Sequence, residues 1–490
     1  MLNTVLISVT EKCNYNCKHC RVVKYRSEID LKNALKIIDK IKDQTRVVNI
    51  TGGEPLLYPK IIPLIDYIKE KTNLKVSMST NGHFLTSRIA QLLKEKGLDG
   101  INISLDSTNP EKHDSFRGKR GAYEAAERGI KIAVKHGLNC RIASSLGKFN
   151  YREVERLIIK AVDLHCSAIS FRRILPISKA LDSLVPELLN KRELFYSLRR
   201  IYKFLFFFYP LFNIYVQEPI DLYITQRLLG RKFGDSGGCG ACRKMIEIKT
   251  NGDVWPCPSL PFKLGNIYKD SLSKILNHRI ARLLIGQKIK GACGDCDLKQ
   301  ICGGCRAWAL FKNNDFIAAD PYCLKDDYQT IVKDLPSFYE KKQLGEEEIR
   351  EIIDLTTKFM KPVLEESGIV WRGELFEQNL RSNKEGMFWL LKFKSKIVGY
   401  LLFVKRGSEI YLKSIIIDRP WQRKKLGFLL IKRLELFANK EGKEKICFAV
   451  QEANKKALTF FENLNYRRVG KEKDKGFIFL KEISKNYSSK

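Results

Sequence analysis

The sequence predicts an α/β protein in three parts: a partial parallel (β/α)6 barrel, a small module stabilised by metal, and a second α/β domain. Short apolar runs alternate with amphipathic helical stretches over residues 1–215, the rhythm of a parallel sheet covered by helices. Cysteine and glycine become dense over residues 236–330 while the periodicity fades, as in modules held by metal rather than by a hydrophobic core. A charged, proline-containing linker at 331–345 leads to a cysteine-poor α/β pattern over 346–490.

The chain is long enough for several hydrophobic cores and is strongly basic. It has 490 residues, 44% of them hydrophobic, and a net charge of +33 that is spread along the whole sequence. We interpret this charge as a lysine-rich surface, with an RNA or acidic peptide partner as the alternative. The longest apolar run, at 204–212, is too short for a membrane span and contains Pro210, and no signal peptide is found. The sequence therefore predicts a soluble, cytoplasmic protein with no membrane partner.

Short runs of apolar and β-branched residues predict the six barrel strands, at residues 4–9, 46–51, 75–80, 100–105, 140–145 and 168–174. Helical patterns, such as 31–43 and 88–97, lie between them. In barrels of this kind the chemistry sits at the carboxyl ends of the strands. Polar motifs follow the first four strands in turn, namely the cysteine run at 13–20, Thr51–Glu54, Thr80–Gly82 and Ser104–Asp106.

Two of these motifs carry chemistry. Cys13, Cys17 and Cys20 have a C-x3-C-x2-C spacing, and three thiolates so close on one loop can hold three irons of a 4Fe–4S cluster. The fourth iron is then open to a small molecule that receives an electron. In the next motif, the glycines before Glu54 let the backbone approach a ligand, and the Glu54 carboxylate can accept hydrogen bonds from an ammonium group. Together the two motifs indicate a reaction centre.

Through CNYNCKHC, TGGEPL, STNG, ISLDS and HDSFRG, roughly the first 215 residues resemble the radical S-adenosylmethionine (SAM) superfamily. The resemblance implies that the three cysteines ligate the cluster and that SAM chelates the open iron. It further implies that reductive cleavage of SAM gives a 5′-deoxyadenosyl radical, which abstracts a hydrogen from the substrate. An electron donor such as ferredoxin or flavodoxin is implied as well.

The same resemblance implies six SAM contacts in addition to the cysteines. For three of them, a surface or supporting position is the alternative. The implied contacts are His19 and Ile174 near the adenine, Gly53 and Glu54 at the amino group, and Ser104 and Arg117 at the ribose or methionine carboxylate; His19, Ser104 and Arg117 are the three with the alternative.

Eight further cysteines lie in the middle of the chain. Their two C-x2-C pairs also have zinc-ribbon spacing, so one or two zinc sites with four thiolates are the alternative to iron–sulfur clusters. Their full order resembles the SPASM module of radical SAM enzymes, which implies two auxiliary 4Fe–4S clusters with complete thiolate ligation and a role in electron transfer. The implied ligands are Cys239, Cys242, Cys257 and Cys305 for the cluster nearer the active site, and Cys293, Cys296, Cys302 and Cys323 for the outer one.

Two departures from that module stand out. Cys302 and Cys305 are separated by two residues where many members have three, a form shared by members with CGGCR. In sulfatase-maturing members an aspartate follows the third cysteine and acts as a base, whereas this chain has Pro258, so formylglycine formation is not expected and no base is assigned. The remaining cysteines stand apart from every grouping and are interpreted as small buried hydrophobes: Cys140, Cys166 and Cys447.

The last part of the chain predicts strands over 386–418, a helix over 420–442 that opens with a basic turn, a strand at 445–450 and a helix at 454–466. A helix N-terminus after such a turn suits a pyrophosphate, because its free N–H groups point outward. The order resembles the GNAT acetyltransferase fold over about 346–485. The implied acetyl-CoA contacts are Ile415 and Ile417 at the pantetheine, Gln422, Arg423, Lys424, Lys425, Leu426 and Gly427 at the pyrophosphate, and Asn454.

Two positions in this domain depart from the GNAT pattern. Lys425 replaces the first glycine of Q-x-x-G-x-G, which gives a bulkier turn. Phe461 replaces the tyrosine that often protonates the leaving thiolate. The domain therefore either transfers an acetyl group with a different acid or only binds acetyl-CoA.

The leading functional hypothesis is a radical SAM/SPASM enzyme that modifies a peptide, protein or peptide-derived substrate and carries a fused N-acetyltransferase domain. We expect no leader-peptide domain ahead of the barrel, because the first predicted strand begins at residue 4, and this weakens the peptide assignment. The first alternative is an RNA-modifying radical SAM acetyltransferase. The second is a zinc-stabilised binding protein with degenerate domains, and metal analysis separates it from the other two.

Overall fold

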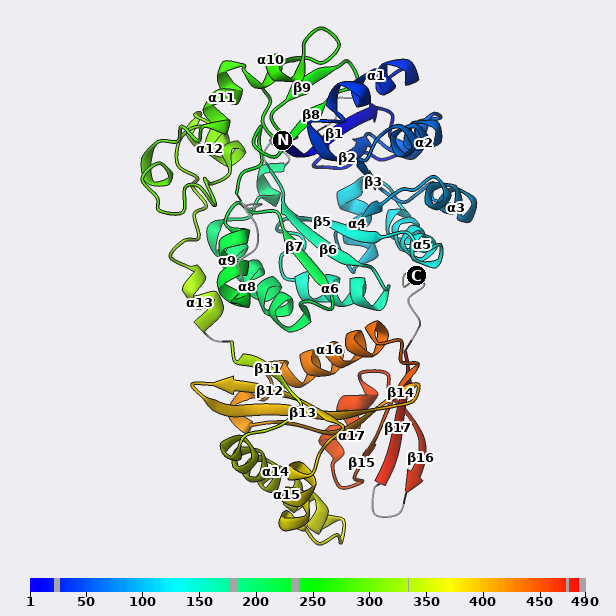
Figure 1. The fold of residues 1–490 in the computed structure, drawn as a ribbon, viewed down its shortest axis with the longest axis vertical. Helices are drawn as coiled ribbons and strands as arrows, with labels where there is room; N and C mark the ends of the chain where they lie inside the picture. The colour runs from blue at the N-terminus through cyan, green and yellow to red at the C-terminus, as the bar shows by residue number, and fades with distance from the viewer. Residues whose placement is uncertain (22–26, 176–183, 231–237, 334, 473–475, 484–490) are drawn as a thin grey trace. The chain divides into compact units, whose positions relative to one another are not determined.

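The computed structural model describes residues 1–490 except 22–26, 176–183, 231–237, 334, 473–475 and 484–490 (Figure 1). The described chain forms two compact units. Unit 1 holds residues 1–206 and 212–331, and unit 2 holds 207–211 together with the chain from 332 to 486. Within the described residues, no helix is both long enough and apolar enough to cross a lipid bilayer.

Unit 1 is built on one ten-stranded sheet with the strand order β10-β9-β8-β1-β2-β3-β4-β5-β6-β7. All neighbours from β8 to β7 run parallel, so the predicted parallel barrel sheet is confirmed. The strands are β1 (Leu2–Thr10), β2 (Thr45–Gly52), β3 (Lys75–Thr80), β4 (Gly100–Ser104), β5 (Cys140–Leu146), β6 (Ala168–Arg173), β7 (Asn213–Val216), β8 (Met245–Ile248), β9 (Asp253–Trp255) and β10 (Gly265–Asn266).

The sheet is wider than the six predicted strands. β7 adds a short strand beside β6, and the cysteine-rich part of the chain contributes β8, which pairs with β1 from Thr4 opposite Met245 to Ile7 opposite Ile248. The cysteine-rich segment therefore continues the barrel sheet instead of forming a module with a separate sheet. This pairing brings the ends of β8 and β9, and with them Cys257, beside the first strand of the barrel.

Helices cover the outer face of the sheet, and Figure 1 shows α1, α2, α3 and α5 following one another along it. Side-chain caps fix where several of them begin, because Asp30, Thr86 and Asn109 each accept a hydrogen bond from a first-turn N–H. The helices of unit 1 are α1 (Leu31–Ile41), α2 (Ile61–Lys71), α3 (Ser87–Glu95), α4 (Pro110–Arg117), α5 (Ala122–Lys135), α6 (Val154–Asp163), α8 (Lys191–Phe208), α9 (Asp221–Leu229), α10 (Leu272–Leu276), α11 (Arg279–Ile285), α12 (Arg306–Asn313) and α13 (Tyr328–Lys333).

The inner face of the barrel sheet is polar, and this is what makes room for a site. Side chains alternate along a strand, so Val76 and Met78 of β3 are buried under the helices while Ser79 points to the other face. There Ser79 Oγ receives hydrogen bonds from Asn49 Nδ2 of β2 at 3.3 Å and from Asn102 Nδ2 of β4 at 3.4 Å. The barrel interior is therefore a polar wall and not a packed apolar core.

The structure shows where the apolar run at 204–212 lies, and it revises one prediction, the one about the isolated cysteines. The apolar run at 204–212 begins inside α8, where Phe204, Phe207 and Phe208 are fully buried core residues. Cys140 and Cys166 are both buried, as expected, but they do not stand apart, because their side chains hydrogen-bond each other between β5 and the loop before β6. Cys447 is only half-buried, and its thiol faces the Ile410 carbonyl oxygen at 3.8 Å.

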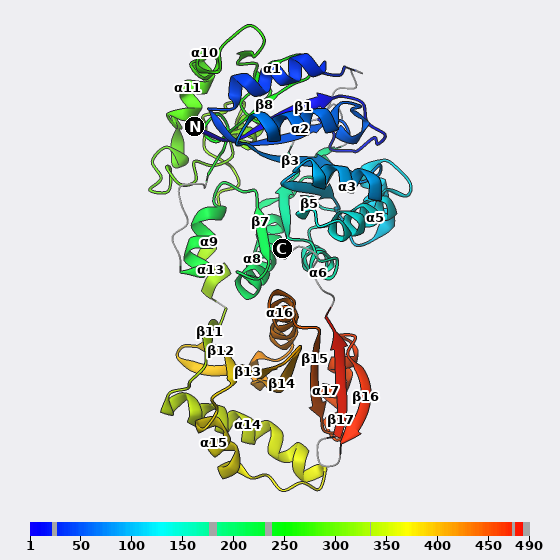
Figure 2. The same cartoon turned by 45° about the vertical axis from the view of Figure 1, so that its right-hand side comes forward.

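Unit 2 has a seven-stranded sheet with the order β11-β12-β13-β14-β15-β17-β16. In both views α14 and α15 lie on one face of this sheet and α16 on the other (Figure 2). The elements are β11 (Ser337–Lys341), α14 (Glu346–Glu366), α15 (Gly373–Arg381), β12 (Gly386–Phe393), β13 (Lys396–Arg406), β14 (Glu409–Ile417), α16 (Leu426–Lys440), β15 (Lys445–Val450), α17 (Lys455–Glu462), β16 (Arg467–Glu472) and β17 (Gly476–Glu482).

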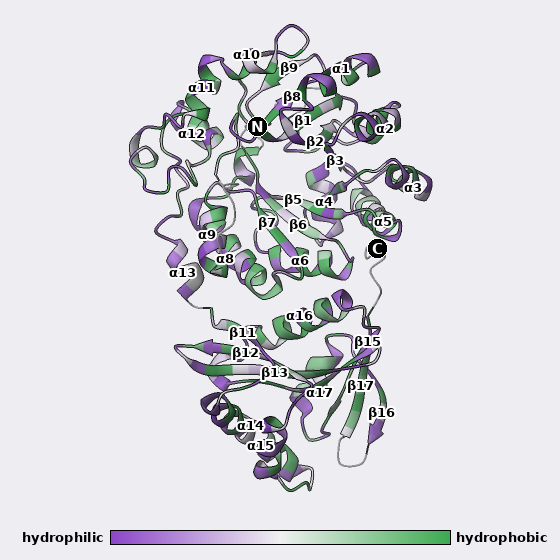
Figure 3. Ribbon diagram, viewed as in Figure 1, coloured by the Kyte–Doolittle hydropathy of each residue, from purple (hydrophilic) through white to green (hydrophobic). Residues whose placement is uncertain are grey.

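Unit 2 buries apolar side chains on both faces of its sheet: α14 and α15 cover one face, and on the other Phe437 of α16 packs against Trp389 and Phe403. Ile352 of α14 packs against Phe388 and Leu390 of β12 and Tyr400 of β13, all of them fully buried. Figure 3 shows hydrophobic stretches in β13 and β17 and a hydrophilic β16. β11 lies inside the segment predicted as a linker and pairs antiparallel with β12 as an edge strand. Its half-exposed sequence, SFYEK, carries too few apolar residues to indicate a strand.

Candidate active site

The cysteine loop follows β1 and is held in place by the end of α4. Lys18 N–H donates to the Phe116 carbonyl oxygen at 3.0 Å. Gly118 ends α4 in the left-handed region at φ +61°, and a Cβ built there would lie 2.2 Å from the Asn16 carbonyl oxygen. A glycine is thus needed where helix and loop meet. This contact fixes the backbone between the first and second cysteines.

His19, between the second and third cysteines, is part of an aromatic stack. Its ring lies parallel to that of Phe116, with centroids 4.5 Å apart, and Phe116 stacks in turn on Phe149 at 4.2 Å. Its Nε2 faces Ser145 Oγ at 3.4 Å. Burial, and after it the nearby Arg117 guanidinium, lowers the pKa of His19 to about 3. His19 is therefore a neutral, flat surface at ordinary pH.

The glycines after β2 allow the loop that follows this strand to pack closely against the cysteine loop. Gly53 N–H donates to the Thr10 carbonyl oxygen at 2.6 Å, and Glu54 N–H donates to the Lys12 carbonyl oxygen at 2.8 Å. A Cβ at Gly53 would lie 2.2 Å from the Lys12 carbonyl oxygen. The sequence had suggested that these glycines admit a ligand. In the structure they bring the loop after β2 against the cysteine loop.

Glu54 is buried, with both carboxylate oxygens engaged. Oε1 accepts from Thr80 Oγ1 at 2.5 Å and from Leu56 N–H at 3.1 Å, and Oε2 accepts from Asn81 N–H at 2.8 Å. Burial raises the pKa of Glu54, while these hydrogen bonds oppose the rise. Glu54 thereby ties the loop after β2 to the end of β3, which places both at one wall of the site.

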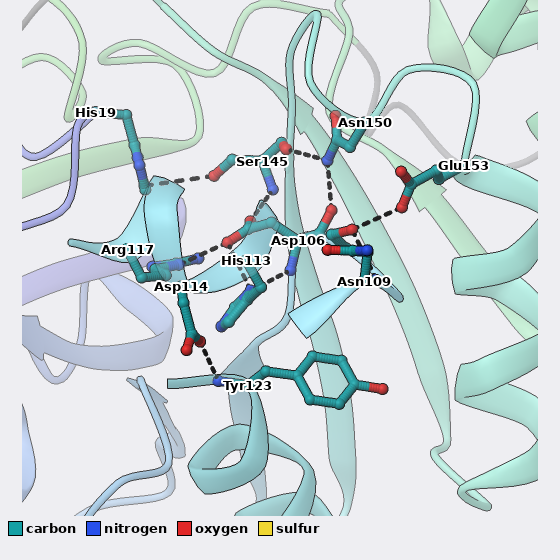
Figure 4. Close-up of polar contacts among 11 residues, drawn as sticks. His19, Asp106, Asn109, His113, Asp114, Arg117, Tyr123, Ser145, Asn150 and Glu153 are labelled. Carbon is teal, nitrogen blue, oxygen red and sulfur yellow. Dashed lines mark hydrogen bonds and ion pairs between the residues drawn. The ribbon is translucent and has the colours of Figure 1, made fainter. Parts of the chain in front are cut away.

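A buried ion pair forms the floor of the site (Figure 4). Arg117 Nε donates to Asp106 Oδ2 at 2.6 Å, and Asp106 Oδ1 accepts from Ser145 N–H at 2.7 Å. Burial alone would raise the pKa of Asp106, but Arg117 and then His113 hold it below its usual range. The Arg117 side chain also hydrogen-bonds the Cys17 thiol, so the floor reaches the cysteine loop directly.

These elements enclose a cavity of about 250 Å³ at the carboxyl ends of the barrel strands. It brings together all nine N-terminal positions singled out from the sequence, namely Cys13, Cys17, Cys20, His19, Gly53, Glu54, Ser104, Arg117 and Ile174. The cavity also contains Thr80 and Asn81 of the predicted polar motif after the third strand, whereas sequence reasoning missed several other lining residues: Tyr15, Arg21, Ser79, Ser145, Arg172, Arg173 and Ser259. Ser79, Ser145 and Arg172 are polar residues near the carboxyl ends of β3, β5 and β6, and this position on the strands was the signal that could have found them.

Burial keeps two of the cavity thiols, those of Cys13 and Cys17, uncharged when nothing is bound to them. Burial raises the pKa of Cys13 to about 11, against the lowering effect of the hydrogen bond from Tyr15 N–H. Burial likewise raises the pKa of Cys17, while Arg117 opposes the rise. Three thiols on one cavity wall have the donor chemistry that an iron–sulfur cluster requires. The residues present therefore fit a cluster with three protein ligands.

The eight middle cysteines fall into two groups of electrostatic neighbours. The pKa of Cys242 is raised by burial and then by Cys257 and Cys239, and that of Cys305 by burial, Asp320 and Cys239. Burial raises the pKa of Cys302 to about 12, with smaller contributions from Asp320, Cys293 and Cys323. Burial also raises the pKa of Cys323, with smaller contributions from Cys293 and Cys296, so cysteines of each predicted set lie close enough to influence one another. Among the described residues, no three Cys, His, Asp or Glu side chains lie close enough together to hold a single metal ion.

In unit 2 the sheet opens where acetyl-CoA contacts were predicted. β14 and β15 pair only from Glu409 opposite Lys445 to Tyr411 opposite Cys447. Beyond this point the β14 edge that carries Ile415 and Ile417 has no strand partner toward β15 among the described residues. The Ile417 carbonyl oxygen accepts from Gln422 Nε2 at 2.9 Å. The result is an open strand edge beside the start of α16.

The remaining positions predicted for acetyl-CoA surround this opening or support it. Arg423 and Lys425 adopt left-handed backbone at φ +59° and +63°, directly before α16 begins at Leu426 and Gly427. Asn454 is a helix cap, because its Oδ1 accepts from Ala457 N–H at 3.1 Å. Phe461 is buried against Phe448, with ring centroids 4.1 Å apart. Lys424 places its ammonium 4.3 Å from the centre of the Trp421 ring.

Comparisons with known proteins match this architecture part by part. The radical SAM superfamily model matches residues 7–161, the iron–sulfur cluster-binding SPASM model residues 239–305, and the GNAT acetyltransferase family model residues 349–466. Residues 7–161 therefore belong to the radical SAM superfamily. The chain combines this part with a SPASM module and with a GNAT domain in its C-terminal part.

Two curated relatives illustrate the range of this class. The AdoMet-dependent heme synthase of Methanosarcina barkeri is 28% identical over 334 residues, covering 64% of this chain and 94% of the relative. The antilisterial bacteriocin subtilosin biosynthesis protein AlbA of Bacillus subtilis is 29% identical over 318 residues, covering 62% of this chain and 67% of the relative. Both matches leave about a third of this chain uncovered.

Solved structures share the fold of unit 1. Native anSMEcpe with bound AdoMet is 19% identical, with a TM-score of 0.55, and the match covers 67% of this chain and 96% of that one. Streptococcus suis SuiB bound to its precursor peptide SuiA is 19% identical, with a TM-score of 0.54, and the match covers 65% of this chain and 75% of that one. These likenesses concern the fold alone.

Proposed function

We propose that this chain is a radical SAM/SPASM enzyme that abstracts a hydrogen from a peptide, protein or peptide-derived substrate and binds acetyl-CoA in its GNAT domain. One observation carries the first part: Cys13, Cys17 and Cys20 line the same cavity as Gly53 and Glu54. When bound, the cluster supplies the electron that cleaves SAM. In this proposal the three thiols hold three of its irons, and the remaining iron faces the cavity.

The protein's own residues would bind and orient SAM. His19 offers a neutral ring stacked on Phe116, which suits an adenine, and Ile174 adds an apolar wall. Gly53 and Glu54 line the cavity beside the cysteine loop and suit the SAM amino group, with Ser104 as a further hydroxyl. Arg117 lines the cavity as a cation anchored on Asp106, in keeping with a carboxylate or ribose contact. Neither Arg117 nor Glu54 is free to swing away, so the site is preorganised.

We further propose that the two groups of middle cysteines hold two auxiliary clusters. Cys239, Cys242, Cys257 and Cys305 would take one, and Cys293, Cys296, Cys302 and Cys323 the other. Asp320 supports this arrangement because it touches both groups. Its Oδ2 accepts from Cys305 N–H at 2.6 Å, and its own N–H faces Cys293 Sγ at 3.3 Å. An electron donor of the ferredoxin or flavodoxin kind and a cytoplasmic location, where thiols stay reduced, complete the proposal.

A peptide substrate is favoured by the names of two similar proteins, the bacteriocin biosynthesis protein AlbA and SuiB with its precursor peptide. A tetrapyrrole is the second candidate, because the heme synthase relative is matched over 94% of its length. Titration of the SAM-loaded enzyme with hemin, followed by Soret absorption, separates the two. Saturable binding at one site would favour the tetrapyrrole, and no spectral change would favour the peptide.

For unit 2, acetyl-CoA binding and N-acetyl transfer are proposed at the open edge of β14 and the start of α16. The positions concerned are Ile415 and Ile417 for the pantetheine, residues 422–427 for the pyrophosphate, and Asn454 next to the cofactor. Backbone N–H groups at the start of α16 suit a pyrophosphate. Because Phe461 has no proton to give, acetyl transfer would need an acid other than a side chain at this position.

The central experiment is an anaerobic assay of the reconstituted enzyme with SAM and dithionite, read as 5′-deoxyadenosine formed. The protein should bind about twelve irons and release 5′-deoxyadenosine, because three clusters of four irons are expected. Cys17→Ala should abolish the product, whereas Cys447→Ala, a change in a thiol outside the three proposed cluster sites, should leave it intact. Abundant zinc with no iron chromophore, or identical activity in the two variants, would contradict the proposal.

A further inference from the structure

Three arginines of the cavity have no proposed role toward SAM or a cluster, and among the described residues one of them makes no ion pair with a carboxylate. Arg172 lies near the end of β6 and lines the cavity together with Arg21 and Ser259. Its Nη2 donates to Ser259 Oγ at 2.6 Å, which is the one side-chain hydrogen bond it makes among the described residues. The side chain is half-buried, so water solvates its charge only in part.

The carboxylates around Arg172 are already taken by other cations. The Glu247 carboxylate forms ion pairs with Arg21 at 3.0 Å and with Lys249 at 2.9 Å, so two cations share it. Glu218 forms a two-point ion pair with Arg173, with contacts of 3.0 and 2.7 Å. In the part of the chain that the structure describes, Arg172 makes no ion pair with a carboxylate. This wall of the cavity therefore carries an excess of positive charge.

Two neighbours place Arg172 between the SAM end and the middle cysteines. It lines the same cavity as His19, and its hydrogen-bond partner Ser259 follows Cys257 by two residues. A group bound at Arg172 would thus lie between the His19 ring and the Cys257 thiol. A substrate has to lie there if the 5′-deoxyadenosyl radical takes a hydrogen from it and an auxiliary cluster takes an electron from it.

A guanidinium that is partly withdrawn from water and lacks a carboxylate favours an anionic ligand, because its planar fork matches a carboxylate with two parallel hydrogen bonds. Arg21 nearby adds a second positive charge, and the Ser259 hydroxyl, which accepts from Arg172, has a proton left to donate. The site thus has a fixed cation, a second cation and a hydroxyl, the set that recognises a carboxylate.

We propose that Arg172, held by Ser259, is the anchor for a carboxylate of the substrate, so that the substrate of this enzyme is an acidic molecule. The inference rests on the proposed radical SAM function and adds the class of substrate. An acidic side chain or chain end of a peptide and a carboxylate of a tetrapyrrole are both sources of this anion. The methionine carboxylate of SAM is a third source, and the experiment has to separate it from the first two.

The test uses the reconstituted, SAM-loaded enzyme and two small probes in anaerobic calorimetry: glutarate, and its uncharged diamide glutaramide. Glutarate should bind and glutaramide should not. Arg172→Gln should weaken glutarate binding at least tenfold, and Ser259→Ala should weaken it by a smaller factor. Arg172→Lys should retain only part of the affinity for glutarate, because lysine keeps the positive charge but cannot make the two parallel hydrogen bonds of a guanidinium. Arg120→Gln, a change in an exposed arginine outside the cavity, should have no effect.

Three results would overturn the inference, and each is separate from failure of the proposed function. Equal glutarate affinity in the wild type and Arg172→Gln, or no binding to the wild type, removes the anion site. A loss of SAM affinity in Arg172→Gln, with glutarate competing against SAM, assigns the arginine to the SAM carboxylate. A loss of bound iron in Arg172→Gln would show that Arg172 instead balances the negative charge of the cysteine thiolates. Absence of 5′-deoxyadenosine from the wild type would instead reject the radical SAM function itself.

Discussion

Arg117 Nε donates a hydrogen bond to Asp106 Oδ2 over 2.6 Å, and this buried pair joins three parts of the barrel. Asp106 follows β4 and also accepts from Ser145 N–H of β5, while Arg117 ends α4 and hydrogen-bonds the Cys17 thiol. The main chain of Asp106 takes part as well, since its carbonyl oxygen accepts from Asn150 Nδ2 at 2.6 Å. The position of the cysteine loop therefore depends on a carboxylate that never faces the cavity.

Replacing Asp106 by Asn should destabilise unit 1 strongly. The change leaves the Arg117 guanidinium buried without its counter-charge, and breaking a buried pair in this way costs roughly 3–5 kcal/mol. Hydrogen exchange of peptides from β4, α4 and β5 would report the loss as a lower free energy of opening. Iron bound at the cysteine loop should fall as well, because Arg117 no longer has a fixed position beside Cys17.

The matched control is Asp43→Asn, the same chemical change at an exposed position outside these contacts, which should alter stability by less than about 0.5 kcal/mol. If Asp106→Asn were as stable as this control, the pair would not hold the floor of the site in the way described.

The sequence predicted the barrel well because its six strands are apolar runs between amphipathic helices, and β1 to β6 appear where those runs lie. The strand β7 was not predicted, because Asn213–Val216 is only four residues long and every second residue is exposed. The cysteines were found from their spacing, since a cluster needs several thiols close in sequence. Arg172 was not found, because its role follows from which carboxylates other cations have taken, and only the fold decides that.

Acid should destabilise the protein through His113, which is buried beneath the site. Burial lowers its pKa to about 4, Asp106 opposes this and Arg117 adds to it; the unfolded value is about 6.5. The unfolded state therefore binds more protons below pH 6.5, so this contribution to stability is complete above that pH and is lost as the pH falls toward 4. By pH 5 the loss should be about 2 kcal/mol.

The experiment compares the pH dependence of unfolding in the wild type and in His113→Asn. The Asn Oδ1 can accept the hydrogen bond that Asp106 N–H now gives to His113 Nδ1 at 3.1 Å, but it does not titrate. The variant should lose less stability between pH 7 and 5 than the wild type. Parallel curves would show that His113 is not the group responsible.

Gly53→Ala should separate the loop after β2 from the cysteine loop. The added Cβ would lie 2.2 Å from the Lys12 carbonyl oxygen and 2.8 Å from that of Glu11, both backbone atoms that cannot rotate away. Overpacking of this kind costs about 1–3 kcal/mol. Iron content and SAM affinity should fall together. Gly100→Ala is the control, because its Cβ would meet its nearest atom at an ordinary 3.6 Å, so both quantities should stay near wild type.

In unit 2, Lys425→Gly should be neutral or stabilising, although it removes a side chain. Lys425 has φ +63°, a left-handed conformation that costs an ordinary residue roughly 1–2 kcal/mol and glycine almost nothing. Glycine loses about 0.5–1 kcal/mol through its greater freedom in the unfolded chain, so the net change should lie between zero and about 1.5 kcal/mol in favour of the variant. Hydrogen exchange of peptides from α16 measures it.

The same change one residue earlier should have the opposite sign. Lys424 does not have positive φ, and its ammonium lies 4.3 Å from the centre of the Trp421 ring, so Lys424→Gly adds chain entropy and removes a cation–π contact. That variant should lose about 1 kcal/mol, and Lys425→Val, which forces a β-branched residue into the left-handed region, should lose at least as much. If Lys425→Gly and Lys424→Gly destabilised α16 equally, backbone strain at Lys425 would not shape this turn, and the lysine itself would have to stabilise it.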